Sequence, residues 1–202
     1  MSCNAMLESF ETTNFVSLEQ KRQQCFDGLM ACAGQSANQV WLAQIIASWQ
    51  VGVGALPDYL GLQPKEFQLL MLRYFPGYHL TGTINSGIKA DFSRMLEKQD
   101  LEQFLRRFVA VQSELSESLI SMLVAACLGS DHLWQDMGLW SRMDLSGLLG
   151  HNFPQLTMLN HKDMKWKKFL YKQLCEAEGI YVCRAPSCEV CKDYAHCFGP
   201  EN

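Results

Sequence analysis

Apolar residues recur at helical spacing along most of this chain, and this periodicity is the feature that most restricts its fold. Trp41, Ile45 and Trp49 show it in the segment 37–50, where they lie on one stripe of a helix. Such a stripe is typical of core packing, although two aromatic rings on one face also suit a cofactor site. No segment alternates apolar and polar residues with the β-branched enrichment of a strand. The pattern therefore predicts an all-α fold.

Capping and stop signals divide the chain into separate helices. Ser17 and Gln20 form a predicted capping box, in which each side chain accepts a hydrogen bond from the other residue's backbone N–H. Pro64 suits the first turn of a helix, and Pro76 ends it. The expected helices are 17–34, 37–50, 64–75, 91–112 (one helix, or two with a break near Asp100), 116–128, 132–137, 143–149, 154–159 and 163–177. We expect them to form one compact multi-helix domain, residues 1–179.

Charge and hydropathy exclude two classes of protein. Seventeen Lys and Arg residues oppose 21 Asp and Glu residues, a net charge of −4, so no global positive field draws the chain to nucleic acid. The longest uncharged stretch, 28–57, is interrupted by glutamines and glycines, unlike a membrane-spanning helix. The first residues have neither a basic nor an apolar region of a signal peptide, so we expect a cytoplasmic protein without membrane or nucleic-acid partners.

Four of the nine cysteines lie within the last 20 residues, in a segment poor in helix-forming patterns. The spacing is Cys-x4-Cys-x2-Cys-x5-Cys, formed by Cys183, Cys188, Cys191 and Cys197. Such short loops allow four sulfurs to converge at little entropic cost. Four thiolates repel each other unless a cation holds them, so the motif predicts a metal site in a cysteine-rich loop, residues 180–202, packed on the helical domain.

The cysteine spacing favours an iron–sulfur cluster over zinc. Structural zinc sites usually join two cysteine pairs across a longer insert, which this motif lacks. Closely spaced cysteine runs are typical of iron–sulfur proteins. A zinc-knot binding module and an iron–sulfur electron-transfer protein remain alternatives. Catalytic signatures such as Gly-x-Ser-x-Gly, His-Glu-x-x-His and the Walker loop are absent, so we do not expect an enzyme.

The C-terminal half resembles the NifQ family of nitrogen-fixation proteins. The resemblance rests on the four-cysteine motif and on the segments before it, ACLGSDHLWQDMGL (126–139) and DMKWKKFLYKQLCEAEGIYV (163–182). It covers about residues 116–200 and is looser in the N-terminal half. Helical DNA glycosylases with an iron–sulfur loop are similar in length and class, but their cysteine spacing differs and their surface is basic.

The resemblance to the NifQ family implies a metal-cluster carrier. Family members carry an iron–sulfur cluster that takes up molybdenum and supply this metal for synthesis of the nitrogenase iron–molybdenum cofactor. The implied cofactors are an iron–sulfur cluster and molybdenum, and the implied partners are the cofactor scaffold complex and the nitrogenase iron protein. The four cysteines would then be the cluster ligands, with Cys197 our choice to face molybdenum.

Other residues are weaker candidates for the site. His196 precedes Cys197 directly, and His132 lies in a short predicted helix, so both are possible nitrogen ligands of the metal. A surface position for His196, and a helix cap or a hydrogen-bonded core position for His132, are the simpler interpretations.

The remaining candidates are thiols and lysines for which we expect structural roles. Cys127 is expected to be a small buried apolar residue, and Cys175 a structural thiol near the packed boundary of the last helix. Lys165, Lys168 and Lys172 are expected on a solvated face, unless they neutralise a cluster or an acidic partner.

Overall fold

The computed structural model describes residues 16–80, 97–177, 179 and 194–201, and every regular element in them is helical. The all-α prediction is therefore confirmed for this part of the chain. The elements are α1 (Leu18–Ala31), α2 (Gln39–Gln50), the 3-10 turn η1 (Asp58–Gly61), α3 (Pro64–Tyr74), α4 (Lys98–Arg106), α5 (Glu114–Cys127), α6 (Leu133–Asp136), α7 (Arg142–Asn152), α8 (Pro154–Leu159), α9 (Trp166–Ala177) and α10 (Tyr194–Cys197).

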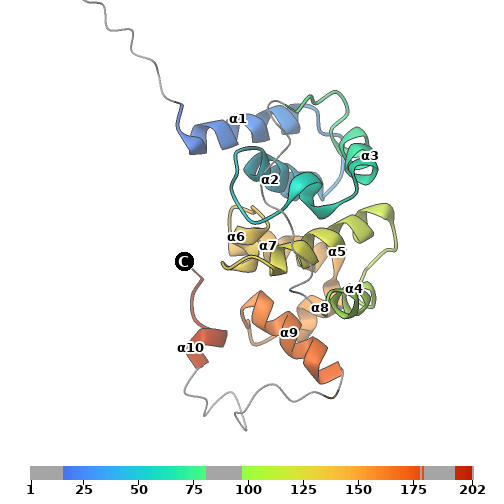
Figure 1. Ribbon diagram of the computed structural model, residues 1–202, viewed down its shortest axis with the longest axis vertical. Coiled ribbons are helices and arrows are strands. Elements are labelled where there is room, and N and C mark those ends of the chain that lie inside the picture. The colour runs from blue at the N-terminus through green and yellow to red at the C-terminus, as the bar shows by residue number, and fades with distance from the viewer. Residues whose placement is uncertain (1–15, 81–96, 178, 180–193, 202) are drawn as a thin grey trace, which may run out of the picture.

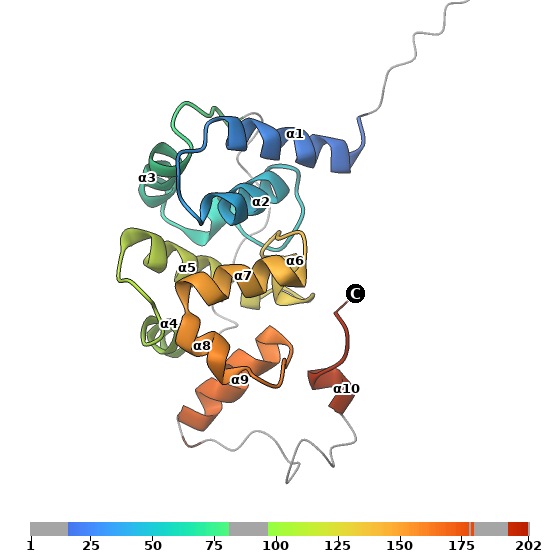
Figure 2. The same ribbon diagram turned by 180° about the vertical axis from the view of Figure 1, so that it is seen from behind.

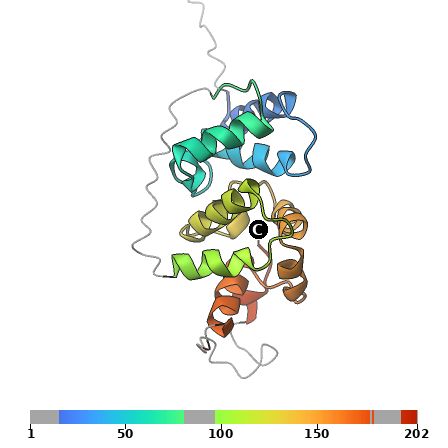
Figure 3. The ribbon, with the colours of Figure 1, turned by 90° about the vertical axis from the view of Figure 1, so that its right-hand side faces the viewer.

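The helices stack in three tiers along the long axis of the molecule (Figure 1). The first three helices lie at one end, and α5, α6 and α7 form the middle tier. At the other end α9 lies with α4 and α8, and α10 lies beside it (Figure 2). The view from the side shows the same order (Figure 3). The C-terminus thus returns from the far end towards α6 and α7.

Two nearly apolar helices supply the centre of the core. Most residues of α2 and α5 are buried, which matches their predominantly apolar, uncharged segments 39–50 and 118–127. Ile45 is fully buried, Trp49 is buried, and Trp41 is half-buried against the core. The tryptophan stripe is therefore core packing, as the simpler interpretation had it. Removal of this apolar surface from water is the main favourable contribution to folding.

The sequence signals located helix starts better than helix ends. The capping box of Ser17 and Gln20 is present, with backbone-to-side-chain distances of 2.8 and 3.1 Å, and α3 begins at Pro64 as predicted. However, α1 ends at Ala31 instead of near Gly34. The predicted helix to residue 112 was also too long, since α4 ends at Arg106. Beyond it, the backbone N–H of Ala110 donates to the carbonyl of Asn152 on α7 (2.8 Å), which competes with a helical path.

The last long helix begins three residues later than the spacing predicted. Asp163 adopts a positive φ of 54°, a conformation incompatible with a right-handed helix, so α9 begins only at Trp166. The side chain of Asn160 closes this turn, accepting from the N–H of Met164 and donating to its carbonyl, both at 2.9 Å. Trp166, Phe169, Leu170 and Leu174 are buried as predicted.

The predicted division at residues 179 and 180 falls at the edge of the described chain, so that boundary stays a prediction. After it, Cys197 and Phe198 pack against the same core as the preceding helices. None of the helices in the described ranges is long and apolar enough to cross a membrane.

Candidate metal centre

One of the four predicted cysteine ligands lies within the described residues. Cys197 is the last residue of α10, half-buried, with a thiol that forms no disulfide. Cys183, Cys188 and Cys191 lie outside the described residues, so the convergence of the four sulfurs stays a prediction. Elsewhere in the described ranges, no three His, Cys, Asp or Glu side chains are grouped closely enough to bind a metal.

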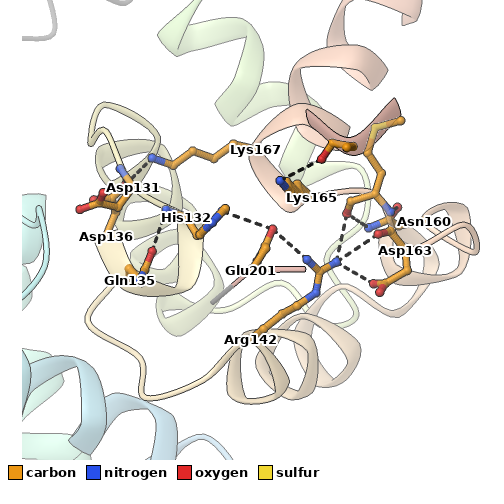
Figure 4. Close-up of polar contacts among 12 residues, drawn as sticks. Asp131, His132, Gln135, Asp136, Arg142, Asn160, Asp163, Lys165, Lys167 and Glu201 are labelled. Atoms are coloured by element: carbon orange, nitrogen blue, oxygen red, sulfur yellow. Dashed lines mark hydrogen bonds and ion pairs between the residues drawn. The ribbon is translucent and has the colours of Figure 1, made fainter. Parts of the chain in front are cut away.

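The backbone of α10 is joined to the start of α9. The N–H of Lys165, the residue before α9, donates to the carbonyl of Cys197 at 2.7 Å. Its Nζ also donates to the carbonyl of Ala195 at 3.3 Å (Figure 4). Both carbonyls belong to a four-residue helix, whose last carbonyls have no partners within the helix itself. Lys165 therefore satisfies them and holds Cys197 at the N-terminus of α9.

The chain that follows Cys197 is held by a buried ion pair. The Glu201 side chain is only 2% exposed, and its Oε1 lies 2.8 Å from Nη1 of Arg142 at the start of α7. The same oxygen lies 3.6 Å from Nδ1 of His132, while Oε2 has no hydrogen-bond partner among the described residues. Burial of an unpaired carboxylate costs free energy, so the ion pair with Arg142 allows the C-terminal tail, residues 198–201, to dock here.

Arg142 also binds the segment that leads into α9. Its Nη2 donates to Oδ1 of Asp163 at 2.7 Å and to the carbonyl of Met164 at 3.3 Å (Figure 4). One guanidinium therefore contacts both the C-terminal tail and the residues just before Lys165. A planar guanidinium with five donors is well suited to such a junction.

The two histidine candidates lie in different environments. His132 is the N-cap residue of α6, where its backbone N–H donates to the side chain of Gln135 at 3.1 Å and its ring faces Glu201. The helix-cap interpretation of His132 is thus confirmed. His196 is exposed on α10. Metal ligation by either histidine stays a prediction.

The three lysines predicted to share a solvated face have different roles. Lys168 is exposed, and Lys172 pairs with Glu176 one turn further along α9 (3.5 Å). Lys165 instead binds α10. The sequence interpretation also missed Lys167, whose ammonium pairs with Asp136, a buried residue of α6. It missed Arg142 and Glu201 as well, because no local pattern links residues so far apart in sequence.

The remaining described thiols differ in their surroundings. Cys127 is buried in α5, and burial raises the pKa of its thiol to about 12, so it is an inert apolar residue as predicted. Cys175 is half-buried on α9, near the packed boundary. Cys25, on α1, is half-buried too, and burial raises the pKa of its thiol despite a hydrogen bond with Tyr78.

Comparison with known proteins identifies the family. The NifQ family model matches residues 41–199, which include the entire four-cysteine motif. The chain belongs to the NifQ family. The family resemblance seen in the sequence is therefore confirmed, and it extends well into the half of the chain where the sequence similarity looked looser.

Similarity over most of the chain supports this NifQ assignment. Protein NifQ of Azotobacter vinelandii is 40% identical over 187 residues, which cover 87% of this chain and 95% of that protein. Protein NifQ of Klebsiella pneumoniae is 32% identical, with 78% and 96% covered. The NifQ protein of Rhodobacter capsulatus is also 32% identical, with 79% and 87% covered. No solved structure matches this chain.

Proposed function

We propose that this protein carries an iron–sulfur cluster that takes up molybdenum and supplies it for nitrogenase iron–molybdenum cofactor biosynthesis. The observation that carries the proposal is the four-cysteine motif within a chain of the NifQ family. Family membership supports a role in nitrogen fixation, and the motif supports a metal cargo. In this role the protein binds and transfers a metal without turning over a substrate.

The donor set suits an iron–sulfur cluster. Thiolates are soft ligands that favour iron–sulfur clusters, zinc and copper(I) over hard oxygen-seeking cations. The residue that the structure describes, Cys197, has a free thiol at the end of α10, and the N–H of Lys165, just before α9, holds its backbone carbonyl. The last ligand is thus presented from a fixed point of the helical domain, while the other three precede it along the chain.

We assign the cluster ligands as Cys183, Cys188, Cys191 and Cys197. The first three, on the tightest spacing, would bind iron, and Cys197 would face molybdenum. Molybdenum prefers a higher coordination number than iron, and a metal that must be released to another protein should occupy the most weakly held corner of the cluster. The proposed recipients are the nitrogenase cofactor scaffold complex and the nitrogenase iron protein, and the proposed location is the cytoplasm.

Metal and sulfide analysis with electron paramagnetic resonance tests the proposal. The protein is purified without oxygen from cells supplied with molybdate. We expect about three irons per chain with sulfide, together with molybdenum. Zinc without sulfide would overturn the proposal in favour of a zinc-knot binding module. Iron and sulfide without molybdenum would indicate an iron–sulfur electron-transfer protein instead.

A further inference from the structure

We propose that four residues, Arg142, Lys165, Cys197 and Glu201, form a latch that positions the Cys197 sulfur and slows release of the bound metal. Arg142 and Glu201 are positioning residues. They hold the chain segments next to Lys165 and after Cys197, and through these segments they fix the position of the sulfur. The part of this inference that concerns metal release rests on the proposed function. The positioning of Cys197 does not, because it can be measured in the metal-free protein.

The first half of the latch is the docked tail. Glu201 is four residues beyond Cys197, and its carboxylate is almost completely removed from solvent against Arg142. A desolvated ion pair with a 2.8 Å contact has one favoured geometry, whereas exposed charges exchange freely with water. The tail therefore has a defined end point only a short distance from the thiol.

The second half is the junction with α9. Lys165 holds the carbonyl of Cys197 from one side, and Arg142 holds Asp163 and Met164, which lead directly into Lys165. The contacts close a ring that runs from Arg142 through residues 163–165 to Cys197 and returns through Glu201 to Arg142. Figure 4 shows the contacts of Arg142 with Asp163 and with Glu201. The position of Cys197 thus depends both on its contact with Lys165 and on the contact of Glu201 with Arg142.

The polar contacts of the latch are separate from the packing of α2 and α5, although Cys197 itself also packs against the core. These polar contacts join the start of α7, the turn before α9 and the C-terminal residues, whereas the buried side chains of α2 and α5 form the core. Opening the latch should therefore loosen Cys197 and leave the other helices folded. Because the two sets of contacts are separate, a substitution at Glu201 should change the accessibility of the Cys197 thiol without unfolding the domain.

Glu201→Gln opens the latch without leaving Arg142 unpaired, since Asp163 still contacts the guanidinium. Glu201→Asp keeps the charge but shortens the side chain. The matched control is Glu176→Gln, the same substitution at a half-exposed residue whose ion pair lies within α9. Circular dichroism establishes that each variant keeps its helix content.

The first measurement is the rate at which a maleimide labels Cys197 in the metal-free protein, followed by mass spectrometry of its peptide. We expect Glu201→Gln to raise the rate about tenfold, because a charged hydrogen bond contributes enough free energy for such a factor. Glu201→Asp should give a smaller rise, and Glu176→Gln none. An unchanged labelling rate in Glu201→Gln would overturn the latch, whatever the protein binds.

The second measurement is the rate at which a chelator removes molybdenum from the loaded protein. We expect faster removal from Glu201→Gln than from the wild type and from Glu176→Gln. If Glu201→Gln is labelled faster but loses molybdenum at the same rate as the wild type, the claim that the latch slows metal release is overturned. If the wild type binds no molybdenum, the proposed function fails, and the labelling result still decides whether the tail positions Cys197.

Discussion

The ammonium of Lys167 on α9 pairs with the buried carboxylate of Asp136 on α6. The same ammonium donates to the carbonyl of Gly129 at 2.8 Å, and the carboxylate accepts from the N–H of Asp131 at 3.1 Å. This network fastens the helix that precedes the cysteine segment to the middle tier. It therefore links the stability of α9 to residues far from it in sequence.

Replacement of Lys167 by Met should lower the free energy of unfolding by about 3 kcal/mol, because it leaves the Asp136 carboxylate buried without its cation. Urea denaturation followed by circular dichroism measures this loss. Lys168→Met is the matched control, since Lys168 is exposed on the next position of the same helix. We expect that control to change the free energy by less than about 0.5 kcal/mol.

A double variant distinguishes charge burial from packing. Lys167→Met combined with Asp136→Leu removes both charges, so it should recover much of the stability lost in Lys167→Met alone. A double variant that is less stable than Lys167→Met would show that the aliphatic contacts, and not the unpaired carboxylate, explain the loss.

Gly129→Ala should destabilise the fold by about 2 kcal/mol, because the added methyl group would overlap the carboxylate of Asp136. Gly150 provides the control. It lies within α7, and a methyl group there would meet no atom within 4 Å. Gly150→Ala should therefore be neutral or stabilising, since alanine favours helix over glycine. Thermal unfolding of both variants tests this, and equal shifts in Tm would argue against a clash.

Deprotonation of Cys127 should lower the free energy of unfolding at alkaline pH. Burial raises the pKa of this thiol from 9.0 to about 12, so the folded protein keeps the proton that the unfolded chain releases. The resulting stabilisation is complete below about pH 9 and is lost as the pH rises towards about 12. We expect the free energy of unfolding of the wild type to fall more steeply over this range than that of Cys127→Ala. Parallel pH profiles would contradict a buried neutral thiol.

Cys191→Ser should abolish cluster binding while the helix content stays near that of the wild type, because the helical domain has its own core. Iron and sulfide analysis together with circular dichroism measures both properties. Cys175→Ser is the control, since Cys175 lies on α9 outside the motif. Loss of the whole fold in Cys191→Ser would show that the cluster and the helical domain fold together.

The helix class and the starts of α1 and α3 were predictable because their signals are local. Ser17 and Pro64 act within one turn of their own backbone, and the stripe of Trp166, Phe169 and Leu170 depends only on helical spacing. The ends of α1 and α4 were not predictable in this way. Ala110 leaves the helical path for a carbonyl of Asn152, a partner brought close only by the packing of α7.

The sequence by itself determined the all-α class, the family and the thiol-rich motif, because residue type, period and spacing are properties of short stretches of chain. Only the tertiary structure decided which charges meet. It showed that Glu201 docks on Arg142, that Lys165 holds Cys197, and that Lys167 pairs with Asp136. Ion pairs between distant residues depend on how the helices pack, since packing alone brings their side chains within reach and removes them from water.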